Sequence, residues 1–285
     1  MLKDIGVVGA GTMGSGVAYD LAQTNHNVVL VDTSDKALKQ AKENIIHSNR
    51  LAAFFNKDSE RKLNIEDVLK NIWFTTDYSE FEKCNYIIEN IKEDWNSKVK
   101  VYKKLDEICS SECIFAANTS CISITKIASV TSRPDKVVGI HFMNPVHLKD
   151  AVEVIKGYHT SEKCLSITTS FLQQLNKQAI IVNDSPGFVS NRLSHLFMNE
   201  AAYVVQDGVA TPAQVDEIFK KCYGHKMGPL ETADLIGLDT VVDSLKVLYE
   251  SYQDTKFKCC PLLQKMVDAG LYGRKSGKGF FDYFE

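Results

Sequence analysis

Short runs of apolar residues alternate with longer segments that repeat apolar residues every three or four positions over the first 183 residues. Runs of the first kind fit buried strands, and segments of the second kind fit helices with one buried face. The predicted strands are residues 4–10, 27–32, 86–90, 113–118, 136–142, 151–156 and 178–183. The predicted helices are residues 13–24, 35–53, 65–71, 96–109, 123–129 and 161–176. Strands that alternate with helices indicate a mostly parallel, doubly wound, Rossmann-like sheet.

The pattern changes at "NDSPGF" (183–188), and every segment beyond it has a helical period. The predicted helices there are residues 188–207, 212–223, 229–253 and 260–269. We therefore predict a Rossmann-like domain over 1–185, with a helical hairpin around the polar turn at 56–62, and an all-α domain over 186–285. The helix at 188–207 is apolar on more than one side, which favours burial at an inter-domain or dimer interface.

Composition narrows the class of protein. The chain has 285 residues, 44% of them hydrophobic, and a net charge of −3, so neither nucleic acid nor an anionic membrane is an expected partner. We find neither a transmembrane run of about 18 apolar residues nor a secretory leader. None of the eight cysteines has C-x-x-C spacing, so we expect reduced thiols in a cytoplasmic protein and no metal site.

A glycine turn carries the first candidate chemistry. Gly9, Gly11 and Gly14 form G-x-G-x-x-G between a predicted strand and a predicted helix, and the next strand ends at Asp32. This arrangement binds a dinucleotide pyrophosphate at the helix N-terminus, with the acid on the adenosine ribose. The charge of Asp32 would repel a 2′-phosphate, which favours NAD over NADP. The alternative is a glycine turn that binds no ligand.

A histidine and a carboxylate form the second candidate site. His141 ends one predicted strand, where ligands of such sheets bind, and Glu153 alternates with two valines in the next strand. A carboxylate on one ring nitrogen makes the other nitrogen a better base, as oxidation of an alcohol requires. Ser120 follows another strand, and Asn191 begins the helix after the boundary. The spacing alone leaves a structural role for His141 and Glu153 open.

The motifs together resemble the short-chain 3-hydroxyacyl-CoA dehydrogenase family, including 3-hydroxybutyryl-CoA dehydrogenases, over nearly the whole chain. The resemblance rests on "GAGTMG", "ANTSCISIT", "RPDKVVGIHFMNPV", "VEVIKG", "DSPGFVSNR", "MGPLETADLIGLD" and "GRKSGKGFFDY". It implies an NAD domain, a helical substrate and dimerisation domain, a homodimer, and oxidation of an (S)-3-hydroxyacyl thioester. It also implies that His141 is the base, that Glu153 is its partner, and that Ser120 and Asn191 contact the substrate oxygen.

The same resemblance implies contacts to both ligands. The implied cofactor contacts are Gly9, Gly11, Thr12, Met13, Gly14, Asp32, Glu93, Lys98, Ser120, Asn144 and Lys275. The implied substrate contacts are Ser48, Ser120 and Asn191.

One segment departs from the family pattern. In "HSNRLAAFFNKD", Ser48 and Arg50 match, but Phe54 and Phe55 stand where family members commonly have lysines that bind the coenzyme A nucleotide. Loss of these lysines would weaken binding of the coenzyme A phosphate. Two further segments, "HFMNPVHLKDAVEV" and "GHKMGPLETADLIGLDTVVDSL", resemble a polyketide-cluster branch that oxidises short hydroxyacyl groups on an acyl carrier protein. The acyl carrier therefore stays open between coenzyme A and a carrier protein.

Two other functions compete. One is an NAD-binding protein without catalytic activity, against which the set Ser120, His141, Glu153 and Asn191 argues. The other is a two-domain dehydrogenase for a free hydroxy acid, which needs a cation to hold the carboxylate. No arginine or lysine neighbours His141 in the sequence.

Overall fold

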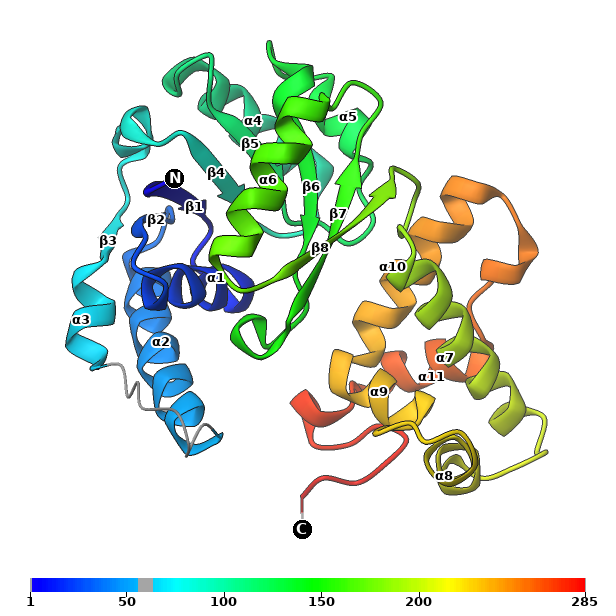
Figure 1. Ribbon diagram of the computed structural model, residues 1–285. Coiled ribbons are helices and arrows are strands. Elements are labelled where there is room, and N and C mark those ends of the chain that lie inside the picture. Colours follow the sequence, from blue (N-terminus) through cyan, green and yellow to red (C-terminus); the bar gives the residue numbers. More distant parts are fainter. Residues whose placement is uncertain (1, 56–63, 285) are drawn as a thin grey trace. The chain divides into compact units, whose positions relative to one another are not determined.

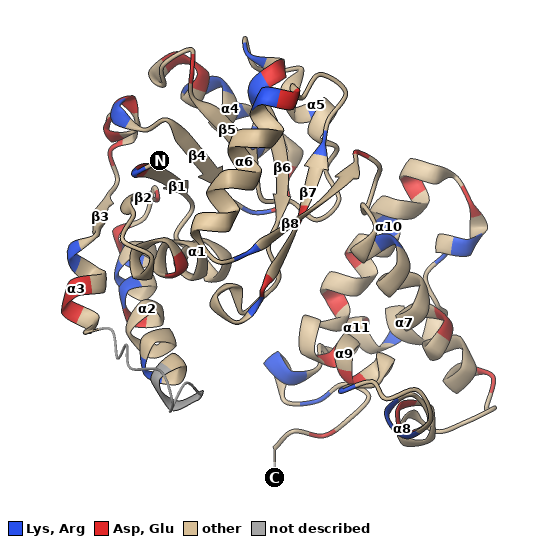
Figure 2. Ribbon diagram, in the orientation of Figure 1, with Lys and Arg blue, Asp and Glu red and all other residues tan. Residues whose placement is uncertain are grey.

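The computed structural model describes residues 2–55 and 64–284, with the backbone alone for residues 53–55. It divides into two compact units, residues 1–185 and 186–285. The predicted polar turn at 56–62 lies outside the described residues. Lysines and arginines are interspersed with acidic residues along both units (Figure 2).

The first unit is built on one eight-stranded sheet (Figure 1). Its strand order is β3-β2-β1-β4-β5-β6-β7-β8, and every neighbouring pair is parallel except β6 with β7. The mostly parallel, doubly wound sheet predicted from the sequence is thus confirmed. The strands are β1 (Asp4–Val8), β2 (Asn27–Val31), β3 (Ile72–Thr75), β4 (Tyr86–Glu89), β5 (Ile114–Ala117), β6 (Val137–His141), β7 (Ala151–Lys156) and β8 (Gln178–Asn183).

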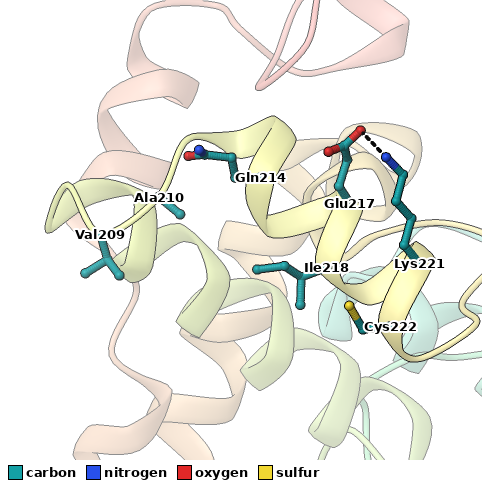
Figure 3. A pocket seen from close by; sticks show the side chains of 7 residues that line it. All are labelled: Val209, Ala210, Gln214, Glu217, Ile218, Lys221 and Cys222. Carbon is teal, nitrogen blue, oxygen red and sulfur yellow. Dashed lines mark hydrogen bonds and ion pairs between the residues drawn. The ribbon is translucent and has the colours of Figure 1, made fainter.

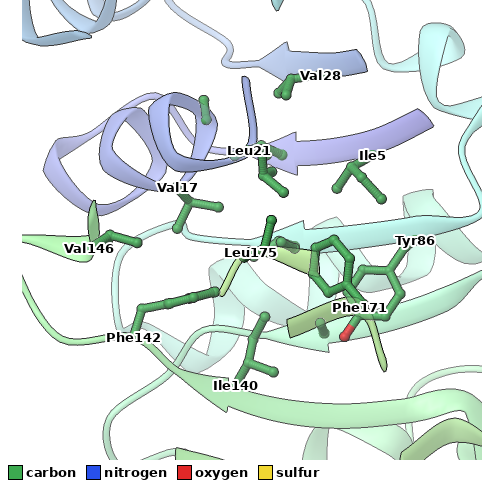
Figure 4. Close-up of a cluster of buried hydrophobic side chains, with 14 of the residues drawn as sticks. Ile5, Val17, Leu21, Val28, Tyr86, Ile140, Phe142, Val146, Phe171 and Leu175 are labelled. Carbon is green, nitrogen blue, oxygen red and sulfur yellow. The ribbon is translucent and has the colours of Figure 1, made fainter. Parts of the chain in front are cut away.

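Helices cover both faces of this sheet. One face packs against α1 (Thr12–Gln23), α2 (Asp35–Phe55), α3 (Ile65–Lys70) and α6 (Glu162–Gln174), and alternate strand residues such as Ile5 and Ile140 supply its core (Figure 4). The other face carries α4 (Trp95–Ile108) and α5 (Ile124–Ala128). Because side chains alternate along each strand, a residue next to a core position of the first face points toward α4 and α5.

The sequence prediction missed β3. This strand has only four residues, "IWFT", lies at the edge of the sheet, and leaves Trp73 exposed. It has too few alternating positions for a strand pattern to stand out from the end of the preceding helix.

The second unit is mainly helical. Its helices are α7 (Ser190–Gln206), α8 (Pro212–Cys222), α9 (Pro229–Ile236), α10 (Leu238–Tyr252) and α11 (Pro261–Asp268). The single helix predicted over 229–253 is wrong, because Gly237 with a φ of 105° separates α9 from α10. The only pairing of strand type in the described part of this unit is two isolated bridges that join Lys278 to Gly273 and to Asp282.

Candidate active site

The three glycines of the turn after β1 differ in their backbone conformation and in the space that a Cβ atom would have. Gly9 has a φ of 91°, a value that favours glycine, and a Cβ there would stand 2.9 Å from the backbone oxygen of Asn90. A Cβ on Gly14 would overlap the backbone oxygen of Gly9. A Cβ on Gly11 would meet no atom within 4 Å. The space beside Gly11 is therefore the part of the turn that is open to a ligand.

The N-terminus of α1 faces this open space. Gly11 is the N-cap of α1 and provides no side-chain cap, so the first N–H groups of the helix, from Thr12 and Met13 onward, are presented to an anion. Asp32 follows β2; its Oδ2 accepts from the amide of Ala10 at 2.8 Å and its Oδ1 from the amide of Ser34 at 3.0 Å. These residues fit a dinucleotide: open backbone for the pyrophosphate and a fixed carboxylate for the ribose.

His141 and Glu153 face each other across the one antiparallel pair of strands. They are direct Cα partners in the register of β6 with β7, so their side chains lie on the same face of the sheet. His141 Nδ1 is 3.1 Å from Glu153 Oε2, and both side chains are less than a tenth exposed. Because a carboxylate only accepts, the proton of the neutral ring lies on Nδ1, and Nε2 is left as an acceptor.

Ser120 lies at the other nitrogen of the same ring. It belongs to the loop after β5, and its Oγ is 3.2 Å from His141 Nε2. Since Nε2 has the lone pair, the serine hydroxyl donates to it. The structure thus brings together three of the four residues that the sequence assigns to catalysis. The ring can take up a proton at Nε2 while Glu153 balances the charge that forms.

Lys98 contacts both Glu93 and the buried acid Glu89. The side chain of Lys98 is fully buried, and its Nζ lies 2.8 Å from both carboxylate oxygens of Glu89 and 3.7 Å from Glu93 Oε2. Tyr102 donates to Glu89 at 3.0 Å. Burial raises the pKa of Glu89, while the ammonium of Lys98 acts in the opposite direction.

The sequence reasoning did not single out Glu89 and Tyr102. Glu89 ends the otherwise apolar strand "YIIE", and all four residues of that strand are buried. An acid in such a run is the signal that could have found it, because a buried charge requires a partner. The partner, Lys98, lies on the first helix that follows.

The remaining predicted residues lie elsewhere in the two units. Asn144 is exposed in the connection between β6 and β7, and Ser48 is half-buried on α2. Side chains at Phe54 and Phe55 lie outside the described residues. In the second unit, Asn191 is in the first turn of α7, and Lys275 pairs with Asp239 at 2.5 Å.

The second unit has a separate pocket of about 410 Å³ along α8 (Figure 3). It is lined by Val209, Ala210, Gln214, Glu217, Ile218, Lys221 and Cys222. Glu217 and Lys221 form an ion pair of 2.9 Å at its rim, and none of the predicted site residues takes part. The pocket therefore gives no support to a catalytic site on α8.

Within residues 2–52 and 64–284, no cluster of three histidine, cysteine or acidic side chains is arranged to hold a metal ion. No described helix has both the length and the apolar composition that a membrane span requires. All eight cysteines fall in the described part, and each is a free thiol.

Comparison with known proteins agrees with this architecture. Residues 4–185 match the family model "3-hydroxyacyl-CoA dehydrogenase, NAD binding domain", and residues 187–283 match "3-hydroxyacyl-CoA dehydrogenase, C-terminal domain". The chain belongs to the 3-hydroxyacyl-CoA dehydrogenase family, and its first unit is the NAD-binding domain of that family.

Within this family, the chain is similar to 3-hydroxybutyryl-CoA dehydrogenases of several bacteria. The chain is 42% identical to a probable 3-hydroxybutyryl-CoA dehydrogenase of Bacillus subtilis, over 100% of this chain and 98% of the relative. It is 44% identical to a protein of the same description from Deinococcus radiodurans, over 98% and 99% of the two chains. The crystal structure of (S)-3-hydroxybutyryl-CoA dehydrogenase from Ralstonia eutropha superposes with a TM-score of 0.93 at 39% identity, with both chains fully covered.

Proposed function

We propose that the protein catalyses NAD-dependent oxidation of a short (S)-3-hydroxyacyl thioester to the 3-oxoacyl thioester. The observation that carries the proposal is the contact of one imidazole with both Glu153, at 3.1 Å, and Ser120, at 3.2 Å. Family membership and the names of the relatives, 3-hydroxybutyryl-CoA dehydrogenases, supply the substrate class.

The chemistry divides between the cofactor and the chain. When bound, NAD would supply the hydride acceptor for oxidation of C3 to a carbonyl, and His141 Nε2 would take the proton of the substrate hydroxyl. The turn at Gly11, the N-terminus of α1 and Asp32 would hold the dinucleotide. The family resemblance adds Glu93, Lys98, Asn144 and Lys275 to that site.

Each residue of the chain has a separate task in this proposal. His141 is the general base, a role that contributes roughly 10²–10⁴ in rate. Glu153 accepts from Nδ1, which fixes the tautomer and stabilises the protonated ring. Ser120 orients the substrate oxygen against Nε2, and we assign Asn191, at the start of α7, to the same oxygen. Ser48 is proposed to bind the acyl carrier.

Assay of the reverse reaction tests the proposal directly. The full chain should oxidise NADH in the presence of acetoacetyl-CoA, and His141→Ala should lose about 10³ in kcat while it still binds NADH. A wild-type protein that binds NADH but oxidises none with any 3-oxoacyl thioester would instead be a non-catalytic NAD-binding protein. Turnover of a free 3-oxo acid, with none of its thioester, would point to a hydroxy-acid dehydrogenase.

A second candidate differs in the acyl carrier. Phe54 and Phe55 replace lysines that are common in the family at this position, which favours a short acyl group on an acyl carrier protein. Acetoacetyl-CoA and acetoacetyl-carrier protein should be compared at equal concentrations. A kcat/KM at least about tenfold higher for the carrier-protein substrate would select this candidate, and the reverse ratio would reject it.

We further propose that the second unit forms a homodimer with a copy of itself. Its described surface leaves several large apolar side chains at least half exposed: Val189, Leu193, Val209, Tyr223, Leu235 and Phe284. The family resemblance implies a homodimer, and these side chains are the candidates for its apolar interface. Light scattering should give twice the mass of one chain, and Leu193→Asp should lower it more than the control Leu148→Asp in the first unit. A monomeric wild type contradicts this proposal.

A further inference from the structure

The loop that carries Ser120 is wrapped around a single carboxylate oxygen. Glu93 Oε1 accepts from the amides of Ser120 at 2.9 Å, Cys121 at 2.9 Å and Ile122 at 3.3 Å, and also from the hydroxyl of Thr119. Three consecutive N–H groups directed at one anion form a concave turn that depends on the anion for its shape. The backbone on both sides of Ser120 is therefore fixed by Glu93.

The carboxylate of Glu93 is itself held from the interior. Lys98 Nζ lies 3.7 Å from Glu93 Oε2 and donates to both oxygens of Glu89 at 2.8 Å. Tyr102 and the amide of Ile91 also donate to Glu89, and the side chains of Lys98 and Glu89 are fully buried. A lysine enclosed in this way cannot swing out without leaving a buried acid unpaired.

The local sequence explains why these groups meet. Glu89 and Ala117 are Cα partners in the register of β4 with β5, so the segments that follow them leave the sheet side by side. Glu93 lies four residues after Glu89, and the Ser120 loop lies at the same distance after Ala117. Lys98 and Tyr102, four positions apart on α4, share its buried face.

We propose that Glu93 is a positioning residue, held by Lys98, which Glu89 in turn holds, and that it fixes the loop 119–122 so that the Ser120 hydroxyl stays beside His141 Nε2, where the substrate oxygen binds. The inference rests on the proposed dehydrogenase function for its effect on rate. It assigns Glu93 and Lys98 a task within the protein that is distinct from the cofactor contacts that the family resemblance implies. It also gives a function to the buried acid Glu89, which no sequence motif marks.

Steady-state kinetics separate positioning from cofactor binding. Glu93→Ala removes the acceptor, and we expect kcat to fall about 100-fold, the loss that a shift of about 1 Å produces in a catalytic group. Glu93→Gln keeps one acceptor oxygen and should fall only about tenfold. Because Glu93 is also an implied cofactor contact while the dinucleotide turn is untouched, the Kd for NADH should rise by less than about tenfold in both variants. The matched control is Glu112→Gln, which alters an exposed ion pair with Lys136 and should leave both kcat and the Kd for NADH unchanged.

The kinetic results that overturn the inference are specific. A Kd for NADH that rises more than about tenfold in Glu93→Ala, with kcat retained at saturating NADH, would make Glu93 a cofactor contact only. A kcat within about threefold of wild type would show that the loop keeps its shape without the carboxylate.

Amide hydrogen exchange gives a readout that does not depend on activity. The amides of Ser120 and Cys121 should exchange at least about tenfold faster in Glu93→Ala than in wild type or Glu112→Gln. The amide of Ile122 keeps Thr119 Oγ1 as an acceptor at 3.1 Å and is not part of this test. Loop amides in Glu93→Ala that are as protected as in wild type would overturn the inference, whether or not the protein has activity. A wild type that is inactive on every thioester would refute the proposed function, while this exchange test would still decide the role of Glu93.

A charge-neutral double variant tests the interior support. Lys98→Met alone would leave Glu89 as a buried charge without its cation. The double variant Glu89→Gln with Lys98→Met therefore removes both buried charges together. We expect this double variant to fold, with loop amides that exchange faster than in wild type and more slowly than in Glu93→Ala. Loop protection equal to wild type would overturn the part assigned to Glu89 and Lys98.

Discussion

Two alanine substitutions in the glycine turn should have opposite effects on stability and ligand binding. A Cβ on Gly14 would overlap the backbone oxygen of Gly9, whereas a Cβ on Gly11 would have no neighbour within 4 Å. Gly11 has a φ of −71° and a ψ of −168°, a conformation that alanine adopts without strain. Gly14→Ala therefore perturbs the packing of α1 on β1, and Gly11→Ala perturbs only the open space before α1.

The magnitudes follow from these contacts. In Gly14→Ala the clash is with backbone, which cannot rotate away, so α1 must shift at a cost of about 3 kcal/mol, the upper end of overpacking. At about 2–4 °C per kcal/mol, the melting temperature should fall by about 6–12 °C. Gly11→Ala restricts the unfolded chain and should keep or raise stability by about 0.4–1 kcal/mol. Its methyl group occupies the approach of the pyrophosphate, so the Kd for NADH should rise at least about tenfold.

Thermal unfolding without ligand and fluorescence titration with NADH measure the two effects independently. The expected outcome is a Gly11→Ala protein as stable as wild type that binds NADH poorly, beside a Gly14→Ala protein that is plainly less stable. Wild-type affinity in Gly11→Ala would show that the dinucleotide does not approach the backbone at this turn. A wild-type melting temperature in Gly14→Ala would refute the packing argument.

Three other predictions test groups within the first unit. Glu153→Gln should lower kcat by about 10²–10³ with little change in the Kd for NADH, and a loss below about threefold would remove the carboxylate from the mechanism. Burial raises the pKa of Asp20 to about 6, although Lys177 acts in the opposite direction. The folded state therefore binds this proton more tightly than the unfolded chain does. As a result, the contribution of Asp20 to the free energy of unfolding falls as the pH rises from about 4 to about 6. Urea denaturation should show the stability of wild type relative to Asp20→Asn decreasing over that window, and an increase would contradict the sign. Arg133 is buried; it pairs with the Asp106 carboxylate at 2.7 Å and donates to the backbone carbonyls of Asp106 and Cys109 at the end of α4. Arg133→Ala should therefore lower the free energy of unfolding by about 3–5 kcal/mol and leave the kcat of the folded protein intact.

The fold followed from the sequence wherever an element was long enough to show its period. The strands and helices of the first unit were predicted within a few residues of their bounds, apart from β3 and short 3₁₀ turns. The break at Gly237 was missed because α9 and α10 are separated by one residue, and the helical period continues across it. A glycine with positive φ is visible only in the backbone, since glycine also occurs within helices.

The sequence supplied candidate residues for the site, but it did not predict the contacts between them. The sequence suggested that Glu153 orients His141, yet the distance depends on the antiparallel register of β6 with β7, and a mostly parallel sheet did not predict that direction. The pairing places the two residues directly opposite each other, which a parallel pairing of these strands would not ensure.

The position of Glu93 follows from strand register in the same way. Parallel strands present their carboxyl ends at one edge of the sheet, so the glycine turn after β1, Asp32 after β2 and the Ser120 loop after β5 converge there. Between β1 and β5 lies β4, and its continuation carries Glu93 into the amides of the Ser120 loop. Asn118 at the end of β5 adds a bond to Asn90 at 2.7 Å, again between the ends of neighbouring strands. A polar residue that follows a central strand of such a sheet therefore has the two adjacent loops within reach, and in this chain one of those loops holds the serine that contacts His141.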